Sequence, residues 1–92
     1  MELIETSTFL NLTKTEQVIL VIQKGEEMLT REEDKYSIHL YVLSNLFVEL
    51  WYVKNSNKIV KARLSDREMV INEYATIEDN VKDLLSKKKA LS

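Results

Sequence analysis

The sequence contains no proline and only one glycine in 92 residues. These two residue types are the strongest local breakers of helices and strands. A chain that lacks them has to turn at Asn, Ser and Asp, which tolerate a left-handed backbone and bond to neighbouring backbone groups. We therefore expect short turns between regular elements and a single domain over residues 1–92.

The composition removes several classes of function. Apolar residues make up 45% of the chain and charged residues 30%, the balance of a globular protein. With no cysteine, disulfides, thiolate nucleophiles and cysteine-ligated metals are excluded. The net charge is −2, with an acidic first half and a mildly basic second half, so the whole molecule does not attract polyanions strongly.

The amino terminus shows no secretory pattern, because Met1–Glu5 lacks a positive start and an apolar core. The longest aliphatic run, Val18–Ile22, is far shorter than the roughly 20 residues that span a bilayer. We expect a cytoplasmic protein that makes no use of a membrane.

Helix signals stand at both ends of the chain. Thr13 and Glu16 have the spacing of a capping box and predict a helix over 14–24, with Gly25 as a left-handed residue just past its end. The stretch 1–12 has apolar residues without a clean period, which leaves a turn of helix or an ordered arm as alternatives.

Near the carboxyl end, Ser65 and Glu68 form a second capping box before another predicted helix. A further helix start at Thr76 precedes an amphipathic stripe, and Lys87–Lys89 suit the negative end of a helix dipole.

Between these helices the apolar period changes to two, which is typical of strands. Strands are predicted over 26–31, 36–43, 47–53 and 59–64. The sequence thus predicts an α+β fold: an antiparallel meander of three to four strands, packed on one face by an N-terminal helix and C-terminal helices.

Three-residue turns at 44–46 and 55–57 would fix the register. They pair Glu49 with Arg63, Trp51 with Lys61 and Val53 with Ile59. The predicted core face consists of Ile38, Leu40, Val42, Val48, Leu50, Tyr52, Val60, Ala62 and Leu64. The other face would carry His39, Tyr41, Phe47, Glu49, Trp51, Lys61 and Arg63, together with Leu43, Val53 and Ile59.

This second face holds too much aromatic surface for a monomer to leave in water without a reason. Our first hypothesis is therefore a non-enzymatic interaction module of adaptor, inhibitor or immunity type, acting as a homodimer or on a protein partner through this face. A second possibility is that the first twelve residues cover it.

A nucleic-acid role is the alternative, because aromatic residues among cations can stack unpaired bases and hold phosphates. The residues that would serve a single-stranded nucleic acid or a small regulatory role are Trp51, Tyr52, Lys54, Lys58 and Lys61.

Catalysis would have to centre on His39 and Glu49. A lone histidine among aromatics is more often a packed side chain, and one histidine with one carboxylate is a poor zinc site. Gly25 has no glycine neighbours that could cradle a phosphate. We expect no enzyme activity, no metal and no cofactor.

One resemblance adds to this interpretation. Gly25-x-x-x-Leu29-x-Arg31, followed by the strand patterns of 36–43 and 47–52, resembles small bacterial α+β proteins with a helix, meander and helix order. The resemblance implies a bacterial cytosolic setting and structural roles for Gly25 and Arg31, and it implies no particular function.

Overall fold

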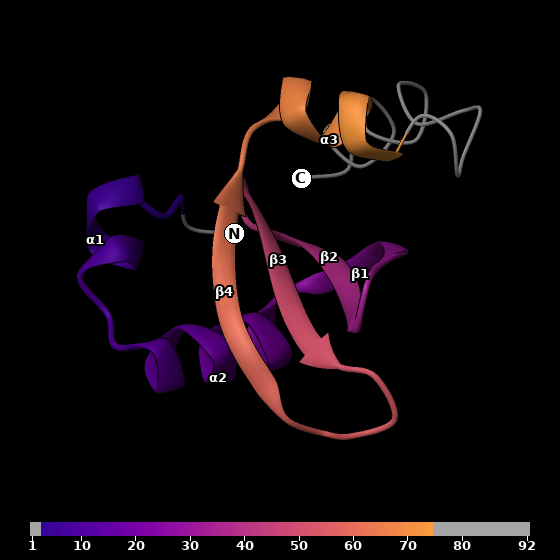
Figure 1. Ribbon diagram of the computed structural model, residues 1–92. Coiled ribbons are helices and arrows are strands. Elements are labelled where there is room, and N and C mark those ends of the chain that lie inside the picture. Colours follow the sequence, from indigo (N-terminus) through magenta and orange to yellow (C-terminus); the bar gives the residue numbers. More distant parts are fainter. Residues whose placement is uncertain (1–2, 75–92) are drawn as a thin grey trace.

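Four strands form one antiparallel sheet in the computed structural model, which describes residues 3–74 (Figure 1). The elements are α1 (Thr6–Leu10), α2 (Lys14–Lys24), β1 (Glu26–Glu33), β2 (Tyr36–Leu43), β3 (Leu46–Val53), β4 (Ile59–Ser65) and α3 (Arg67–Tyr74). Neighbours in sequence are neighbours in the sheet, so the predicted α+β class and meander are confirmed. The helix expected from Thr76 and the run Lys87–Lys89 lie outside the described residues.

The turns of the sheet use the residue types that the sequence offered in place of glycine. Asp34, Ser44 and Asn55 all take a left-handed backbone, with φ of 52°, 56° and 63°. Each lies in the connection between two consecutive strands. A short polar side chain lowers the energetic cost of the left-handed conformation.

The β2–β3 turn is tighter than predicted. Leu43 pairs directly with Leu46, so the turn has two residues rather than three. The left-handed Ser44 at its start is the backbone feature that such tight hairpin turns require.

This one-residue difference reverses the faces of β2. Leu40 pairs with Glu49, whereas Tyr41 pairs with Val48. The prediction that Ile38, Leu40 and Val42 share a face with Val48 and Leu50 is therefore wrong, because a side-chain period of two turns any odd slip into an exchange of faces.

Two bulges adjust the edge strands. Met28 is an extra residue in β1, since Glu27 pairs with Tyr41 and Leu29 with Leu40. Val60 is an extra residue in β4, where Ile59 pairs with Tyr52 and not with Val53 as predicted. The other two predicted pairs, Glu49 with Arg63 and Trp51 with Lys61, are confirmed.

The capping box of α2 is confirmed: the Thr13 hydroxyl accepts from the Glu16 N–H, and the Glu16 carboxylate accepts from the Thr13 N–H. The left-handed conformation predicted for Gly25 is wrong, because its φ is −83°. Glycine is needed there for space, since a Cβ would lie 2.6 Å from the Val21 carbonyl oxygen.

The second predicted capping box, Ser65 with Glu68, is wrong. The N–H of Met69 donates to Asp66 Oδ1 at 2.8 Å, so Asp66 caps the start of α3. The Ser65 hydroxyl is buried and has no hydrogen-bond partner within the described residues.

The helices lie on different sides of the sheet (Figure 1). Val21 of α2 and Phe9 of α1 pack on the face that carries Val48 and Leu50, here called the α2 face. Val70 and Tyr74 of α3 pack on Leu40, which belongs to the opposite α3 face. The sheet therefore has a core on each side, rather than one face packed by all helices.

The described part of the amino-terminal segment, residues 3–12, does not fold over Trp51. Ile4 and Leu12 pack with the cluster on the α2 face, and the Ile4 N–H donates to Asn45 Oδ1 at 2.9 Å. None of the helices described between residues 3 and 74 combines the length and apolar character that crossing a bilayer requires.

Candidate functional site

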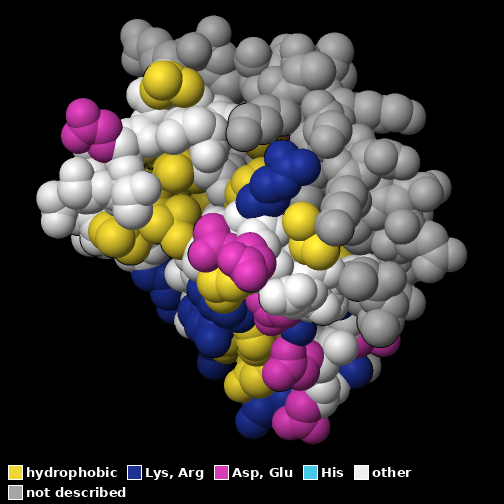
Figure 2. All heavy atoms as spheres, turned by 90° about the horizontal axis from the view of Figure 1, so that it is seen from above, with side chains coloured by type: hydrophobic (Ala, Val, Ile, Leu, Met, Phe, Trp, Pro, Cys, Tyr) yellow, Lys and Arg dark blue, Asp and Glu magenta, His cyan; other side chains and the backbone are white. Residues whose placement is uncertain are grey.

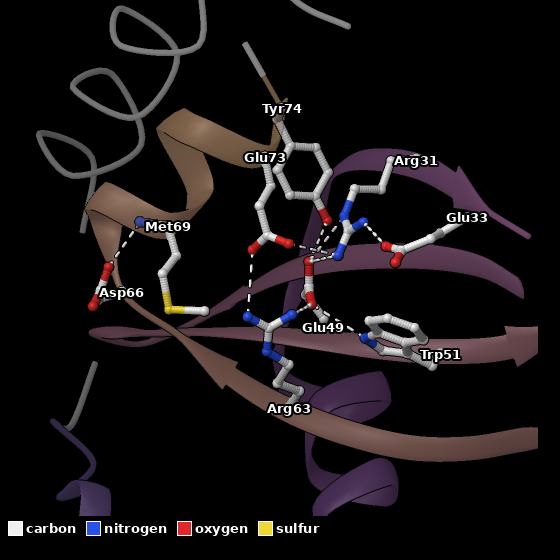
Figure 3. A network of polar contacts seen from close by, with 9 residues as sticks. All are labelled: Arg31, Glu33, Glu49, Trp51, Arg63, Asp66, Met69, Glu73 and Tyr74. Atoms are coloured by element: carbon white, nitrogen blue, oxygen red, sulfur yellow. Dashed lines mark hydrogen bonds and ion pairs between the residues drawn. The ribbon is translucent and has the colours of Figure 1, made fainter. Parts of the chain in front are cut away.

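The most distinctive polar feature of the α3 face is Glu49, a carboxylate with no exposed surface in the middle of β3 (Figure 3). Its Oε2 accepts from Arg31 Nη2 at 3.2 Å, from Arg31 Nε at 3.3 Å and from the Tyr74 hydroxyl at 2.8 Å. Its Oε1 accepts from Trp51 Nε1 at 3.1 Å and from Arg63 Nη1 at 3.3 Å. Five hydrogen bonds offset the large cost of burying this charge.

Two further carboxylates complete the cluster. Glu73 of α3 accepts from Arg31 Nη2 at 2.9 Å and from Arg63 Nη2 at 3.5 Å. Glu33 accepts from the remaining Arg31 nitrogen, Nη1. Side chains from β1, β3, β4 and α3 thus meet at one point, here called the Glu49 cluster (Figure 3).

Burial and charge act against each other at Arg31. Its side chain is only 8% exposed, which disfavours the charged form. The hydrogen bond to Glu33 and the charges of Glu49 and Glu73 outweigh that cost and hold the pKa of Arg31 above its usual value. At Tyr74, burial and then the charge of Glu49 raise the pKa of the phenol, which stays a neutral donor.

Trp51 lies at the rim of this cluster and is enclosed by cations. The Lys61 ammonium stands 3.9 Å from its ring centroid and the Arg31 guanidinium 5.4 Å. Tyr36 packs edge-on at 5.6 Å. Only 8% of Trp51 is exposed, so the ring offers little free surface for stacking.

The contacts of the Glu49 cluster indicate a structural role. Both oxygens of Glu49 accept hydrogen bonds from residues that are themselves packed. No oxygen of Glu49 faces solvent, which leaves it poorly suited to exchange protons with a substrate. The cluster instead ties α3 to three strands.

The predicted interface set is divided by the reversal of β2. Phe47, Glu49, Trp51, Lys61 and Arg63 lie on the α3 face, as their β3–β4 pairing requires. The other two members, His39 and Tyr41, lie on the α2 face.

The alternative nucleic-acid set is divided as well, because Trp51 and its neighbour Tyr52 point to opposite faces.

Charges of both signs also mix at the surface. Figure 2 shows Lys and Arg side chains interleaved with Asp and Glu on the face that it presents. Such mixing does not make the single-sign stripe that polyanions prefer.

His39 and Glu49 do not meet. His39 pairs with Leu50 on the α2 face and is bonded to Ser37 and Glu27 instead. These three residues line a hollow with a volume of about 620 Å³ beside the β3–β4 loop. The catalytic centre considered from sequence is therefore split between two sides of the sheet.

Sequence reasoning missed Arg31, Glu73 and Tyr74 as members of a site. A weak signal exists for Arg31, the one basic residue within an acidic strand. Nothing local marks Tyr74, which lies 25 residues from its acceptor Glu49.

No group of three or more His, Cys, Asp or Glu side chains within residues 3–74 is arranged to hold a metal ion. Comparison of the chain with protein families, with curated proteins and with solved structures finds no match.

Proposed function

We propose that the protein is an interaction module that binds an extended, acidic segment of a partner protein along the outer edge of β4. The observation that carries this proposal is a strand edge that no other described segment pairs with. β4 is seven residues long and ends the sheet. Within residues 3–74, the backbone hydrogen bonds of its ladder run to β3 alone. An unpaired edge offers main-chain groups to another strand.

The two edges of the sheet differ in how they are protected. β1, at the other edge, carries glutamate at four of its eight positions and is bent by the Met28 bulge. Charges and bulges are common devices against unwanted strand pairing. β4 also has a bulge, at Val60, but its charged residues are Lys61 and Arg63, so its edge repels a basic strand and not an acidic one.

The charges near β4 favour an acidic partner. Lys58 and Lys61 are exposed, and neither forms an ion pair among the described residues. Lys61 is held in place over Trp51, so its ammonium is positioned before any partner arrives. Carboxylates on an added strand would find these two cations beside the main-chain groups.

Pairing with a second copy is less favourable. Two β4 strands paired about Ala62 would set Lys61 of each copy opposite Arg63 of the other, and like charges in that position destabilise a pair. Pairing of β4 with β1 of another copy would be head-to-tail and open-ended, and it would meet the Met28 bulge. A strand from a different protein avoids both problems.

The test uses the full chain and a synthetic peptide of alternating Glu and Val. Amide chemical-shift mapping is expected to show changes concentrated in β4, and binding is expected to weaken roughly tenfold in Lys61→Glu. The matched control is the same peptide with every backbone amide methylated, which keeps the charges but removes all the N–H donors that strand pairing needs. Equal binding of the methylated peptide, or shifts centred on another element, would overturn the proposal.

Two further readings separate the alternatives. Light scattering of the chain without peptide is expected to give the monomer mass of 10.8 kDa, and a dimer would indicate a self-interface. An oligothymidylate that binds more tightly than the peptide, with affinity falling steeply as salt is added, would establish the nucleic-acid role instead.

A further inference from the structure

The hollow on the α2 face is a second candidate site, and no residue of β4 lines it. Its walls combine aromatic rings with hydroxyl, amide and charged groups. They are formed by Glu27, Ser37, His39, Tyr41, Tyr52, Val53, Lys54, Asn55, Ser56 and Asn57. Residues from three strands and the β3–β4 loop therefore line an open hollow that is large enough for a small molecule.

Three of these side chains form a continuous hydrogen-bonded chain. Ser37 and His39 are alternate residues of β2 and point to the same face, with Ser37 Oγ 3.3 Å from His39 Nε2. The other ring nitrogen, His39 Nδ1, is bonded to Glu27 Oε1. Nucleophile, base and orienting carboxylate stand in the order that activates a serine hydroxyl.

The Met28 bulge makes this order possible. Without the extra residue, β1 would keep strict alternation and Glu27 would point away from the face of Thr30 and His39. With it, Glu27 pairs with Tyr41 and shares the face of His39. Bulges often re-aim a side chain beside a functional site.

We propose that Ser37 is a reactive hydroxyl that accepts the acyl group of a small carboxylic ester, with His39 as general base and Glu27 as the positioning residue. Glu27 keeps the proton of the imidazole on Nδ1, so that the Nε2 lone pair faces the hydroxyl. This inference does not depend on the proposed partner at the edge of β4.

The reaction needs only the ester and water. Ser37 Oγ bonds to the ester carbonyl carbon while His39 Nε2 takes the hydroxyl proton, and that proton passes to the departing alkoxide as the C–O bond breaks. Water, deprotonated by His39, then attacks the acyl-serine and releases the carboxylic acid, and the proton returns to Ser37. The products are one alcohol and one acid.

The surroundings of the relay fit this chemistry. The His39 ring is steadied by an edge contact with Tyr52, with ring centroids 4.9 Å apart. Lys54 and Asn55 line the hollow, and their side chains carry N–H donors of the kind that stabilises developing negative charge on oxygen. The rings of Tyr41 and Tyr52 supply apolar surface for a short acyl chain.

The test is acylation of the full chain by p-nitrophenyl acetate, followed by intact-mass measurement and peptide mapping. We expect one acetyl group per chain, located on Ser37, and one equivalent of nitrophenolate released rapidly. Ser37→Ala is expected to abolish this adduct, and His39→Gln to slow it by roughly 10²-fold or more. Ser7→Ala, which changes an exposed serine on α1, is the control that should retain it.

Three further variants guard against effects of misfolding and test the role of Glu27. Ser37→Cys keeps a nucleophile at the same position and is expected to accumulate a thioester there. Glu27→Gln is expected to change the pH dependence of acylation, and Glu27→Asp to restore part of the rate. The absence of any adduct on Ser37, or acetylation of lysines that proceeds equally in Ser37→Ala, would overturn the proposal.

Discussion

Glu49 shows at the scale of one residue how a buried charge is made tolerable, and it gives the sharpest test of stability. Glu49→Gln removes the negative charge that Arg31 and Arg63 share, and leaves two cations under-compensated in a packed site. Breaking a buried ion pair from one side costs about 3–5 kcal/mol, so we expect the free energy of unfolding to fall by about 3 kcal/mol or more.

Urea unfolding followed by the fluorescence of Trp51, the only tryptophan, measures this change. Glu33→Gln is the matched control, because Glu33 bonds the same arginine but its side chain is 55% exposed. Its cost should stay below about 1 kcal/mol. Equal losses in the two variants would mean that burial does not set the strength of the cluster.

The Glu49 cluster also shows what could be predicted at this scale. The Glu49–Arg63 pair followed from strand register, and the structure confirms it. Arg31 and Tyr74 lie 18 and 25 residues from Glu49 in the sequence. Their hydrogen bonds to Glu49 depend on how β1 and α3 pack in the folded chain. Contacts set by tertiary packing leave no local pattern in the sequence.

At the scale of the element, the limit of prediction was the length of one turn. The strands, the first capping box and the turns at Asp, Ser and Asn could be predicted from local chemistry. The choice between two and three residues at Ser44 could not, because both faces of β2 are apolar enough to be buried. Alternation specifies register only where one face is clearly polar.

The α2–β1 junction gives a prediction for an element boundary. Gly25→Ala places a Cβ 2.6 Å from the Val21 carbonyl oxygen and 3.4 Å from Tyr41 Cδ2. The closer atom is backbone, so the end of α2 would have to shift against the sheet. We expect a loss of about 1–3 kcal/mol in unfolding free energy, measured by urea unfolding.

Gln23→Ala, an exposed change on the same helix, is the control and should alter stability by less than about 0.5 kcal/mol. A Gly25→Ala variant as stable as this control would show that the junction is loose. Steric crowding by the Val21 carbonyl would then not explain why position 25 is a glycine.

At the scale of the whole molecule, packing on both sides of the sheet removes two tyrosines from water, Tyr74 fully and Tyr41 in part. Burial, followed by the charges of Tyr52 and Glu27, raises the pKa of Tyr41 to about 12. Burial and Glu49 raise the pKa of Tyr74 as well. In the unfolded chain both phenols return to an ordinary pKa of about 10.

The sign of the pH dependence follows from proton binding. Between about pH 10 and 12 the folded protein keeps protons on Tyr41 and Tyr74 that the unfolded chain has lost. The folded state then binds more protons, so the free energy of unfolding falls as pH rises. We expect the stability supplied by these two phenols to be complete below about pH 10 and to decline above it.

Urea unfolding at intervals from about pH 8 to 11 tests this decline. Tyr41→Phe and Tyr74→Phe should each reduce the slope above about pH 10, because each removes one group that titrates differently in the two states. Absorbance of tyrosinate in the folded protein gives an independent reading, since Tyr41 should ionise only near pH 12. An unchanged slope in both variants would place the alkaline loss elsewhere and would mean that the two cores do not shield these rings from water.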